Sequence, residues 1–167
     1  MDKLTNQLVL DRLEAKFGDQ VLRLGEPYEL LTLVVKVDAI VEVLDFAKND
    51  DLLGFRYLTD ITAVHYPHQE EQYMVVYHLH NMFHNIRLRI KVAIGGEQPA
   101  IPSATSIWKG ANWMERETYD FYGIDFIGHP DLRRILNMDD LDVFPMRKEY
   151  PLEDPNRIDK KNFYFGR

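Results

Sequence analysis

Apolar residues recur at helical spacing at the start of the chain. A helix is predicted over residues 4–17, and its apolar face comprises Leu4, Leu8, Leu13 and Phe17. Gly18 is a typical residue to end such a helix. A short strand is then predicted over residues 21–24, before the turn residues Gly25 and Pro27.

The pattern then alternates between strand and helix. Alternating apolar residues predict a strand over 29–37. Asp38 is suited to cap a helix over 39–48, whose apolar face contains Ile40, Val43 and Leu44. The first half of the chain therefore supplies both elements of a layered α+β fold.

Three further strands are predicted over 55–65, 73–80 and 86–94. Residues 55–65 lack clean alternation, which is typical of a strand covered on both faces. Residues 86–94 alternate most clearly, and their polar positions are Arg87, Arg89 and Lys91. A cationic strand face is a common way to discourage pairing at a sheet edge.

A last helix is predicted over 104–122, with Ser103 as its N-cap. The elements together indicate an α+β fold: a mainly antiparallel sheet of four to five strands with helices on one face. We expect two parts, an α+β domain over 1–122 and an extended, partner-binding C-terminal segment over 123–167.

Composition narrows the class of protein. A chain of 167 residues that is 46% hydrophobic and 28% charged is typical of a soluble globular domain with a small appendage. A net charge of −7 argues against nucleic-acid binding. The absence of cysteine excludes disulfides, thiolate zinc sites and cysteine-held iron–sulfur clusters. No apolar run approaches the roughly 20 residues of a membrane helix, and the N-terminus resembles neither a secretory signal nor a transit peptide.

Histidines offer one candidate for chemistry. His78 and His80 point the same way on a strand, His84 follows in the next turn, and Asp60 could supply another ligand. Such a set would suit zinc or iron in a stand-alone metal-dependent hydrolase. The alternative, which we favour, is a solvent-facing strand that happens to contain histidine.

Carboxylates offer a second candidate. Glu115, Glu117 and Asp120, with His129, could form a general acid–base group. Glu115 and Glu117 diverge by about 200° around a helix, however, so a charge network that fixes the helix end is the better interpretation. Arg116 could pair with Asp120 at i+4.

Acids at a helix C-terminus oppose the helix dipole and need cationic partners. For Glu117 and Asp120, Arg133 or Arg134 could serve. Residues 115–152, here called the signature segment, are dense in charged, aromatic and turn residues, so we expect them to need a surface that belongs largely to another protein.

The signature segment resembles a known family. Its first part, ERETYDFYGIDFIGHPDLRRIL over 115–136, is similar to the signature of the 30 kDa subunit (the C subunit in bacteria) of the proton-pumping NADH–quinone oxidoreductase, respiratory complex I. A second box contains Pro145, Arg147, Lys148 and Pro151-Leu152. The sequence departs from the family at 142–145, Asp-Val-Phe-Pro, where a Gly-His-Pro turn is common, so any role of that histidine does not carry over.

The resemblance implies a hydrophilic subunit of the peripheral arm that holds no cofactor itself, with flavin and iron–sulfur clusters in partner subunits. Its partners would be the large subunit with the quinone site and the iron–sulfur subunits. It would reach the membrane only through them, on the cytoplasmic side of the bacterial inner membrane. The residues expected at partner interfaces are Glu115, Arg116, Glu117, Asp120, His129, Pro130, Asp131, Arg133, Arg134, Arg147 and Lys148. The alternative is the equivalent subunit of a membrane-bound nickel–iron hydrogenase or formate hydrogenlyase.

Overall fold

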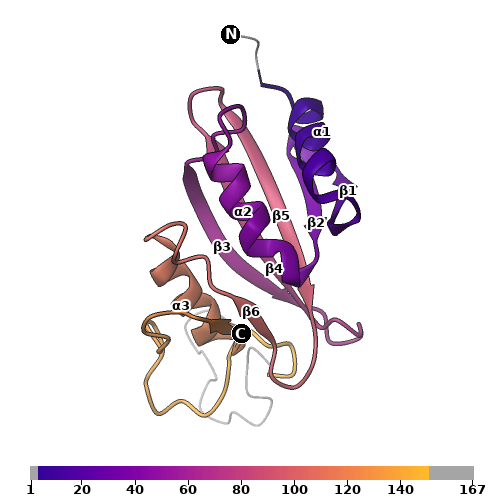
Figure 1. Ribbon diagram of the computed structural model, residues 1–167. Coiled ribbons are helices and arrows are strands. Elements are labelled where there is room, and N and C mark those ends of the chain that lie inside the picture. The colour runs from indigo at the N-terminus through magenta and orange to yellow at the C-terminus, as the bar shows by residue number, and fades with distance from the viewer. Residues whose placement is uncertain (1–3, 151–167) are drawn as a thin grey trace, which may run out of the picture.

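Five strands form the central sheet of the computed structural model, which describes residues 4–150 (Figure 1). They are β1 (Val21–Gly25), β2 (Leu31–Val35), β3 (Tyr57–His65), β4 (Tyr73–Asn81) and β5 (Ile86–Ile94). Their order across the sheet is β1-β2-β5-β4-β3. The β2–β5 pair is parallel and the other pairs are antiparallel. The predicted fold class, a mainly antiparallel α+β sheet, is therefore confirmed.

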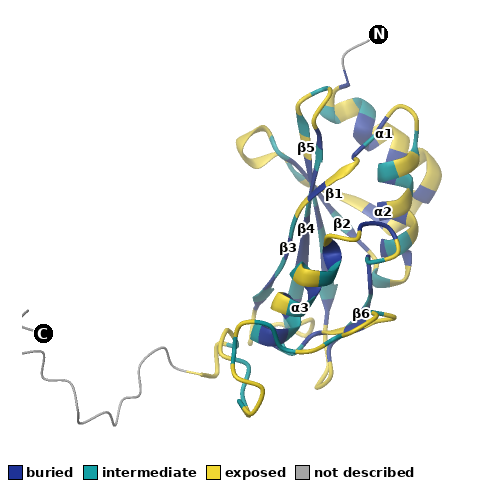
Figure 2. Ribbon diagram, turned by 90° about the vertical axis from the view of Figure 1, so that its left-hand side faces the viewer, coloured by how far each residue is buried: buried dark blue, intermediate teal, exposed yellow. Residues whose placement is uncertain are grey.

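Two helices cover one face of this sheet, here called the helix-bearing face. Seen edge-on in Figure 2, α1 (Asn6–Phe17) and α2 (Ile40–Asn49) lie on the same side of the strands. The hydroxyl of Thr5 accepts a hydrogen bond from the Leu8 amide and so caps α1. The two helices meet through Phe17 and Phe46, whose rings pack edge to face with centroids 5.7 Å apart.

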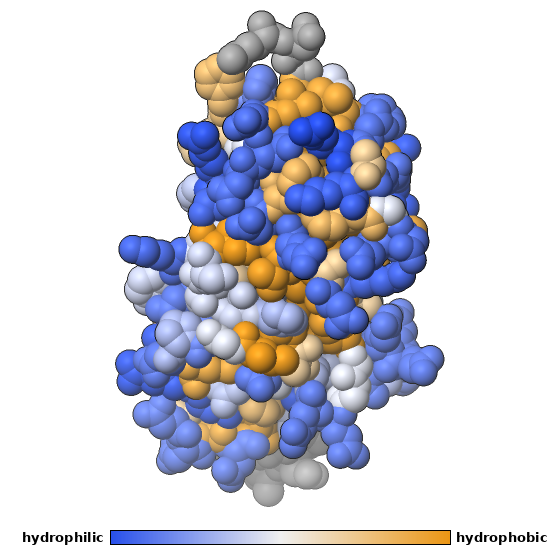
Figure 3. Space-filling view, in the orientation of Figure 1, coloured by the Kyte–Doolittle hydropathy of each residue, from blue (hydrophilic) through white to orange (hydrophobic). Residues whose placement is uncertain are grey.

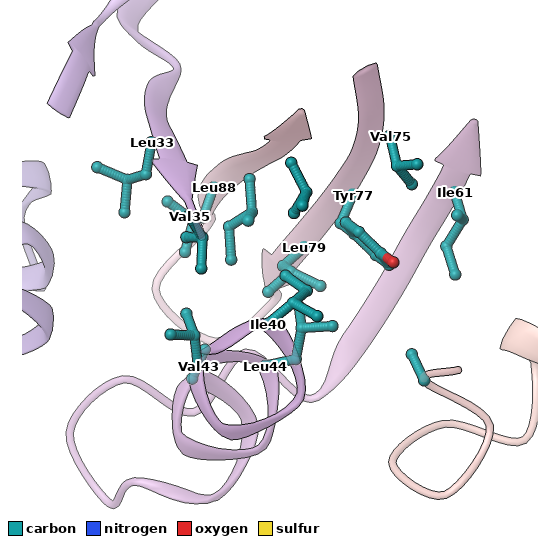
Figure 4. Close-up of a cluster of buried hydrophobic side chains, with 14 of the residues drawn as sticks. Leu33, Val35, Ile40, Val43, Leu44, Ile61, Val75, Tyr77, Leu79 and Leu88 are labelled. Carbon is teal, nitrogen blue, oxygen red and sulfur yellow. The ribbon is translucent and has the colours of Figure 1, made fainter. Parts of the chain in front are cut away.

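The core lies between these helices and the sheet. Figure 4 shows Ile40, Val43 and Leu44 of α2 beside strand residues such as Leu79 and Tyr77. All five of these side chains are buried. Those of α2 share one face of the helix through their 3–4-residue spacing, and those of β4 share one face of the sheet through strand alternation. Around the helices the surface is mainly hydrophilic, with hydrophobic residues visible between them (Figure 3).

Short 3-10 turns shift several predicted boundaries. They are η1 (Gly18–Gln20), η2 (Pro27–Glu29) and η3 (Val37–Ala39). The predicted strand 29–37 is therefore trimmed to β2, and Asp38 lies exposed within η3. The prediction that Asp38 caps α2 is wrong, since the N-cap is Ala39 and makes no side-chain cap bond.

Two expectations about strand environment are also wrong. β3 is not covered on both faces: it is an edge strand with alternating burial, in which Tyr57 and Thr59 are exposed. β5, whose cations were expected to discourage edge pairing, is the central strand and has partners on both sides. Its charged face therefore cannot serve to protect a sheet edge.

The last helix, α3 (Ala111–Tyr122), begins seven residues later than predicted. Ser103 does not cap α3, because the N-cap of this helix is Gly110; the Ser103 hydroxyl donates to Glu115 and accepts from the Thr105 amide. Residues 104–110 form turns in which Ile107 and Trp108 are buried. α3 lies along the edge of β3 that pairs with no strand, where the Thr118 hydroxyl donates to the Ile61 carbonyl (3.3 Å).

A small parallel pair of strands, β6 (Ala100–Pro102) and β7 (Asp125–Ile127), flanks α3. Both contain only three residues, too few for a periodic signal. Ile124 and Phe126 are buried in the main core, so the chain contributes to the folded body beyond residue 122. Residues 128–150 contain no helix or strand, and the rest of the expected C-terminal segment, 151–167, lies outside the described residues.

Candidate functional site

The carboxylate of Asp120 is the centre of the signature segment. Asp120 lies in the last turn of α3, fully buried, and its Oδ2 accepts hydrogen bonds from three successive backbone amides, those of Ile135, Leu136 and Asn137, at 2.8–3.0 Å. Converging amides of this kind form an anion-binding nest. Its Oδ1 accepts from Arg134 Nη1 (2.8 Å) and from the Asn137 side chain (3.1 Å).

These donors fix the ionisation state of Asp120. Burial acts to raise its pKa, but the backbone amides and Arg134 outweigh burial and hold the pKa well below its usual range. Asp120 is therefore a permanent anion at neutral pH. It is a structural anchor for residues 134–137 rather than a proton donor or acceptor.

Arg134 extends the same network into the following loop. Beyond the Asp120 carboxylate, its guanidinium donates to the carbonyl oxygens of Asp120 (3.1 Å), Leu141 (2.6 Å) and Val143 (3.1 Å). One planar fork with several donors can hold distant backbone segments together in this way. The predicted Arg134–Asp120 partnership is confirmed.

Arg116 has a similar role from the side of α3. It donates through Nε to the Arg133 carbonyl (3.1 Å) and through Nη2 to the Arg134 carbonyl (2.9 Å). The predicted i+4 pair of Arg116 with Asp120 is absent, because Asp120 points into its amide nest. Arg133 itself is exposed and pairs with Asp131 (2.9 Å).

Phe144 is held between two guanidinium groups. Arg134 and Arg147 lie 5.0 and 4.8 Å from the Phe144 ring centroid, within cation–π range. Arg147 Nε also donates to the Tyr122 carbonyl at the end of α3 (2.7 Å). Gly123 follows with φ +70°, and a Cβ there would lie 2.5 Å from the Phe144 ring. Only glycine fits this position.

His129 and its neighbours form a tight turn beside α3. His129 Nδ1 accepts from the Asp131 amide (3.0 Å), so the other ring nitrogen, Nε2, carries hydrogen and donates to the Asn112 carbonyl (3.0 Å). Pro130 lies exposed in this turn. With both nitrogens engaged, His129 acts as a brace, and it is not placed beside Glu115 or Glu117 as a catalytic group would require.

Glu115 is a second buried carboxylate of α3, just over one turn before Asp120. It accepts from the Ser103 hydroxyl and the Ala104 amide, both at 2.6 Å, and burial raises its pKa to about 7 although these hydrogen bonds act to lower it. Nearby Tyr77 is also buried, and its hydroxyl has no hydrogen-bond partner among the described residues. Glu115 therefore secures the turn before α3 to the helix.

The remaining predicted residues are placed at the surface. Glu117 is exposed on α3, and Lys148 is exposed as well, although its backbone amide donates to His65 Nδ1 (2.9 Å). The predicted carboxylate cluster therefore separates into a buried Glu115, an exposed Glu117 and an Asp120 enclosed by donors. This arrangement supports no acid–base group.

The histidine hypothesis also lacks a ligand set. His78 Nε2 accepts from Arg89 (2.9 Å), while its Nδ1 lies 4.0 Å from Asp60. His80 lies 3.3 Å from the Asn85 side-chain oxygen. Within residues 4–150, no group of three or more His, Cys, Asp or Glu is arranged to hold a metal ion.

Several contributors to this network were not predicted from the sequence. Asn137, Phe144 and Tyr122 complete the network, yet each looks ordinary in the sequence. The one available signal was Gly123, a glycine directly after an aromatic-rich helix, which marks a left-handed helix end. Residues 115–150 thus form a clamp, here called the α3 clamp, that fixes an irregular segment against the end of α3.

Among residues 4–150, no helix is long and apolar enough to cross a bilayer. The surface of the clamp nevertheless carries large exposed hydrophobic side chains, and these are Ile127, Leu136, Met138, Met146 and Tyr150. Exposed apolar side chains gathered on one segment are typical of a protein–protein contact.

The sequence of this chain matches a known protein family. The family described as "Respiratory-chain NADH dehydrogenase, 30 Kd subunit" matches residues 33–156. The C subunit of the NADH-quinone oxidoreductase of Sinorhizobium medicae is 46% identical over 152 residues, covering 91% of this chain and 75% of that protein. The corresponding protein of Citrifermentans bemidjiense, which has the same name, is 41% identical over 152 residues, covering 91% and 93%.

Solved structures share the fold. A trypsin-resistant fragment of Nqo5 is similar with a TM-score of 0.64 and 30% identity, covering 75% of this chain and 98% of that one. A chain of an archaeal membrane-bound sulfane sulfur reductase has a TM-score of 0.75 at 24% identity, covering 87% and 85%, and shows the fold alone. Because the family match spans most of the chain, including the α3 clamp, the chain belongs to the family of the 30 kDa subunit of respiratory-chain NADH dehydrogenase.

Proposed function

We propose that this chain is a non-redox subunit of the peripheral arm of a proton-pumping NADH–quinone oxidoreductase. It supports electron transfer from NADH to quinone by assembling and stabilising the subunits that hold the quinone site and the iron–sulfur clusters. Flavin and iron–sulfur clusters belong to those partners, and this chain holds no cofactor. It lies on the cytoplasmic side of the bacterial inner membrane and associates with the membrane through its partners.

This proposal rests on the contacts that the signature residues make. Arg116, Asp120, Arg134 and Arg147 each bond to backbone groups, and Arg134 also pairs with Asp120. Their polar atoms are therefore engaged within the fold rather than offered to a substrate. A clamp of this kind creates a shaped, rigid surface, and rigid presentation lowers the entropic cost of binding. The relatives that match most of the chain are named as the C subunit of NADH-quinone oxidoreductase.

The test is a mild-detergent pull-down of the tagged full chain from its native membranes, with mass spectrometry of the co-purifying subunits. We expect flavin, iron–sulfur and antiporter-like membrane subunits. Recovery of a nickel–iron large subunit would replace the proposal with its hydrogenase alternative. Recovery of the chain alone would contradict both.

Variants of the clamp surface sharpen this test. Leu136→Asp with Met138→Asp changes two exposed side chains, 63% and 70% exposed, so the fold should tolerate them. We expect at least a tenfold loss of co-purifying subunits. The matched control is Leu52→Asp with Met82→Asp, which makes the same changes at exposed positions in the turn after α2 and the β4–β5 hairpin.

A further inference from the structure

The face of the sheet opposite α1 and α2, here called the open face, has no covering element among the described residues (Figure 2). The 128–150 segment lies elsewhere: Arg147 stacks over Tyr73 (5.4 Å) and the Lys148 amide binds His65, both on the helix-bearing side. α3 occupies the β3 edge. The open face is therefore bare in the described part of this chain.

The open face is more apolar than a sheet face that contacts only solvent. A solvated sheet face is normally polar. Here Val34, Val64 and Val76 lie on it, together with Leu22, which pairs with Val34 and is 58% exposed. Val76 is buried at 6% exposure, and Val34 and Val64 are half-buried. A flat, partly apolar surface of this kind is suited to burial against another surface.

A row of cations crosses the middle of this face. Arg87, Arg89 and Lys91 occupy alternate positions of β5, the central strand, so they point to the same side about 6.6 Å apart. None of the three forms a salt bridge with a described residue. Asp60 on β3 lies 4.0 Å from His78 Nδ1, and Glu26 and Glu29 line the same surface hollow as Arg87 and Arg89.

His78 orients Arg89 at the centre of the row without adding a charge to it. Arg89 Nε donates to His78 Nε2 (2.9 Å), so that ring nitrogen is unprotonated. Burial and the nearby Arg89 lower the pKa of His78, which keeps the ring neutral at physiological pH. The chain as a whole has a net charge of −7, but this face is locally cationic, and the Arg89 side chain at its centre is held by His78.

We propose that the open face docks an acidic, partly apolar segment of a partner subunit, an inference that rests on the proposed function and adds a second contact surface to it. Carboxylates of the partner pair with Arg87, Arg89 and Lys91, and its apolar side chains cover Leu22, Val34 and Val64. Alternate carboxylates of an extended strand repeat at the same spacing as this row, which gives a direct match. Such complementarity sets register and specificity.

Two other classes of partner fit less well. Nucleic-acid binding draws most of its affinity from a broad basic surface, whereas this row is a single file in an acidic chain. Peripheral membrane binding relies on an apolar face whose side chains enter the headgroup region, whereas the valines of this face are buried or half-buried and a row of cations crosses it. The acidic protein segment is therefore the occupant that the charge and shape favour.

The first test compares two double variants of the tagged full chain in the same pull-down as above. Arg87→Glu with Lys91→Glu reverses the row but leaves Arg89 on His78. Arg56→Glu with Lys109→Glu gives the same net charge at exposed positions before β3 and before α3. We expect at least tenfold less co-purified partner for the first variant and less than a twofold change for the control.

The outcomes separate this proposal from the function itself. If wild type and both variants recover the complex equally, the open face is not a docking surface, while the subunit assignment stands. If wild type recovers no complex, the assignment fails first. Circular dichroism of both purified variants shows whether either loss is merely unfolding.

The second test identifies the class of partner. Amine-reactive labelling of Lys91 should fall at least fivefold in the assembled complex relative to the isolated chain. Carbodiimide cross-linking should join the Lys91 ammonium to an aspartate or glutamate of another subunit. Equal labelling in both states would overturn the proposal. So would protection of Lys91 by anionic vesicles or by DNA without partner subunits.

Discussion

Asp120 and Arg134 form an ion pair inside the α3 clamp, with Oδ1 and Nη1 2.8 Å apart and side chains 0% and 11% exposed. A buried pair of this kind is weak evidence of stability by itself, because desolvating two charges is costly. It becomes informative here because the carboxylate also satisfies three backbone amides that would otherwise be unpaired. The pair therefore determines the path of the chain after α3.

Asp120→Asn should destabilise the protein strongly. The substitution leaves the Arg134 charge without its counter-ion and directs an amide donor toward the amide nest, so we expect a loss of about 3–5 kcal/mol in the free energy of unfolding. Urea denaturation followed by circular dichroism measures it. Asp131→Asn is the control, because its pair with Arg133 is exposed on both sides and should cost less than about 1 kcal/mol.

Arg134→Lys should release the 128–150 segment while leaving the sheet intact. One ammonium cannot reach the carboxylate and the carbonyls of Leu141 and Val143 together. We expect cleavage after Leu141, whose carbonyl Arg134 holds, by a chymotrypsin-like protease to accelerate at least tenfold. Arg133→Lys should leave this rate unchanged. Equal rates for the two variants would show that Arg134 does not hold the segment.

The accuracy of each predicted helix or strand depended on the length of its hydrophobic pattern. β4 and β5 span nine residues each, and their alternation was enough to place them within one residue. β6 and β7 could not be found, because three residues give no period. The start of α3 was misplaced since Ile107 and Trp108 mimic a helical stripe while they actually fill the core from a turn.

The clamp was predictable only in part. Opposition to the helix dipole correctly indicated that Asp120 needs a cation, and Arg134 supplies it. The amide nest could not be foreseen, because it depends on backbone directions at 135–137 rather than on side-chain identity. The position of β5 at the centre of the sheet also required the parallel β2–β5 pair, which no local pattern encodes.

Gly123→Ala should perturb the clamp more than Gly128→Ala does. Both glycines have positive φ (+70° and +83°), so each substitution carries a backbone cost of about 1–2 kcal/mol. At Gly128 a Cβ meets nothing within 4 Å, whereas at Gly123 it would displace Phe144. We therefore expect Gly123→Ala to cost at least about 1 kcal/mol more in urea denaturation. Equal losses would mean that Phe144 moves aside freely.

Stability should depend on pH through Glu115. Burial raises its folded-state pKa to about 7, whereas the unfolded carboxyl titrates near its ordinary value of 4.5. Between these two values the folded state binds a proton that the unfolded state does not. Stability therefore falls as pH rises from about 4.5 to about 7, by an amount on the order of 3 kcal/mol at most, and is unaffected by this group outside that window.

Glu115→Gln isolates this contribution. Glutamine keeps an acceptor for the Ala104 amide and cannot ionise, so the variant should lose the decline between pH 4.5 and 7 and be more stable than wild type at pH 8. His65, whose pKa is lowered by burial, titrates in both proteins and cancels in the comparison. Glu117→Gln, an exposed neighbour, should follow wild type at every pH. Parallel urea midpoints for wild type and Glu115→Gln across this pH range would show that folding does not raise the pKa of Glu115, and that the Ser103 and Ala104 hydrogen bonds offset its burial.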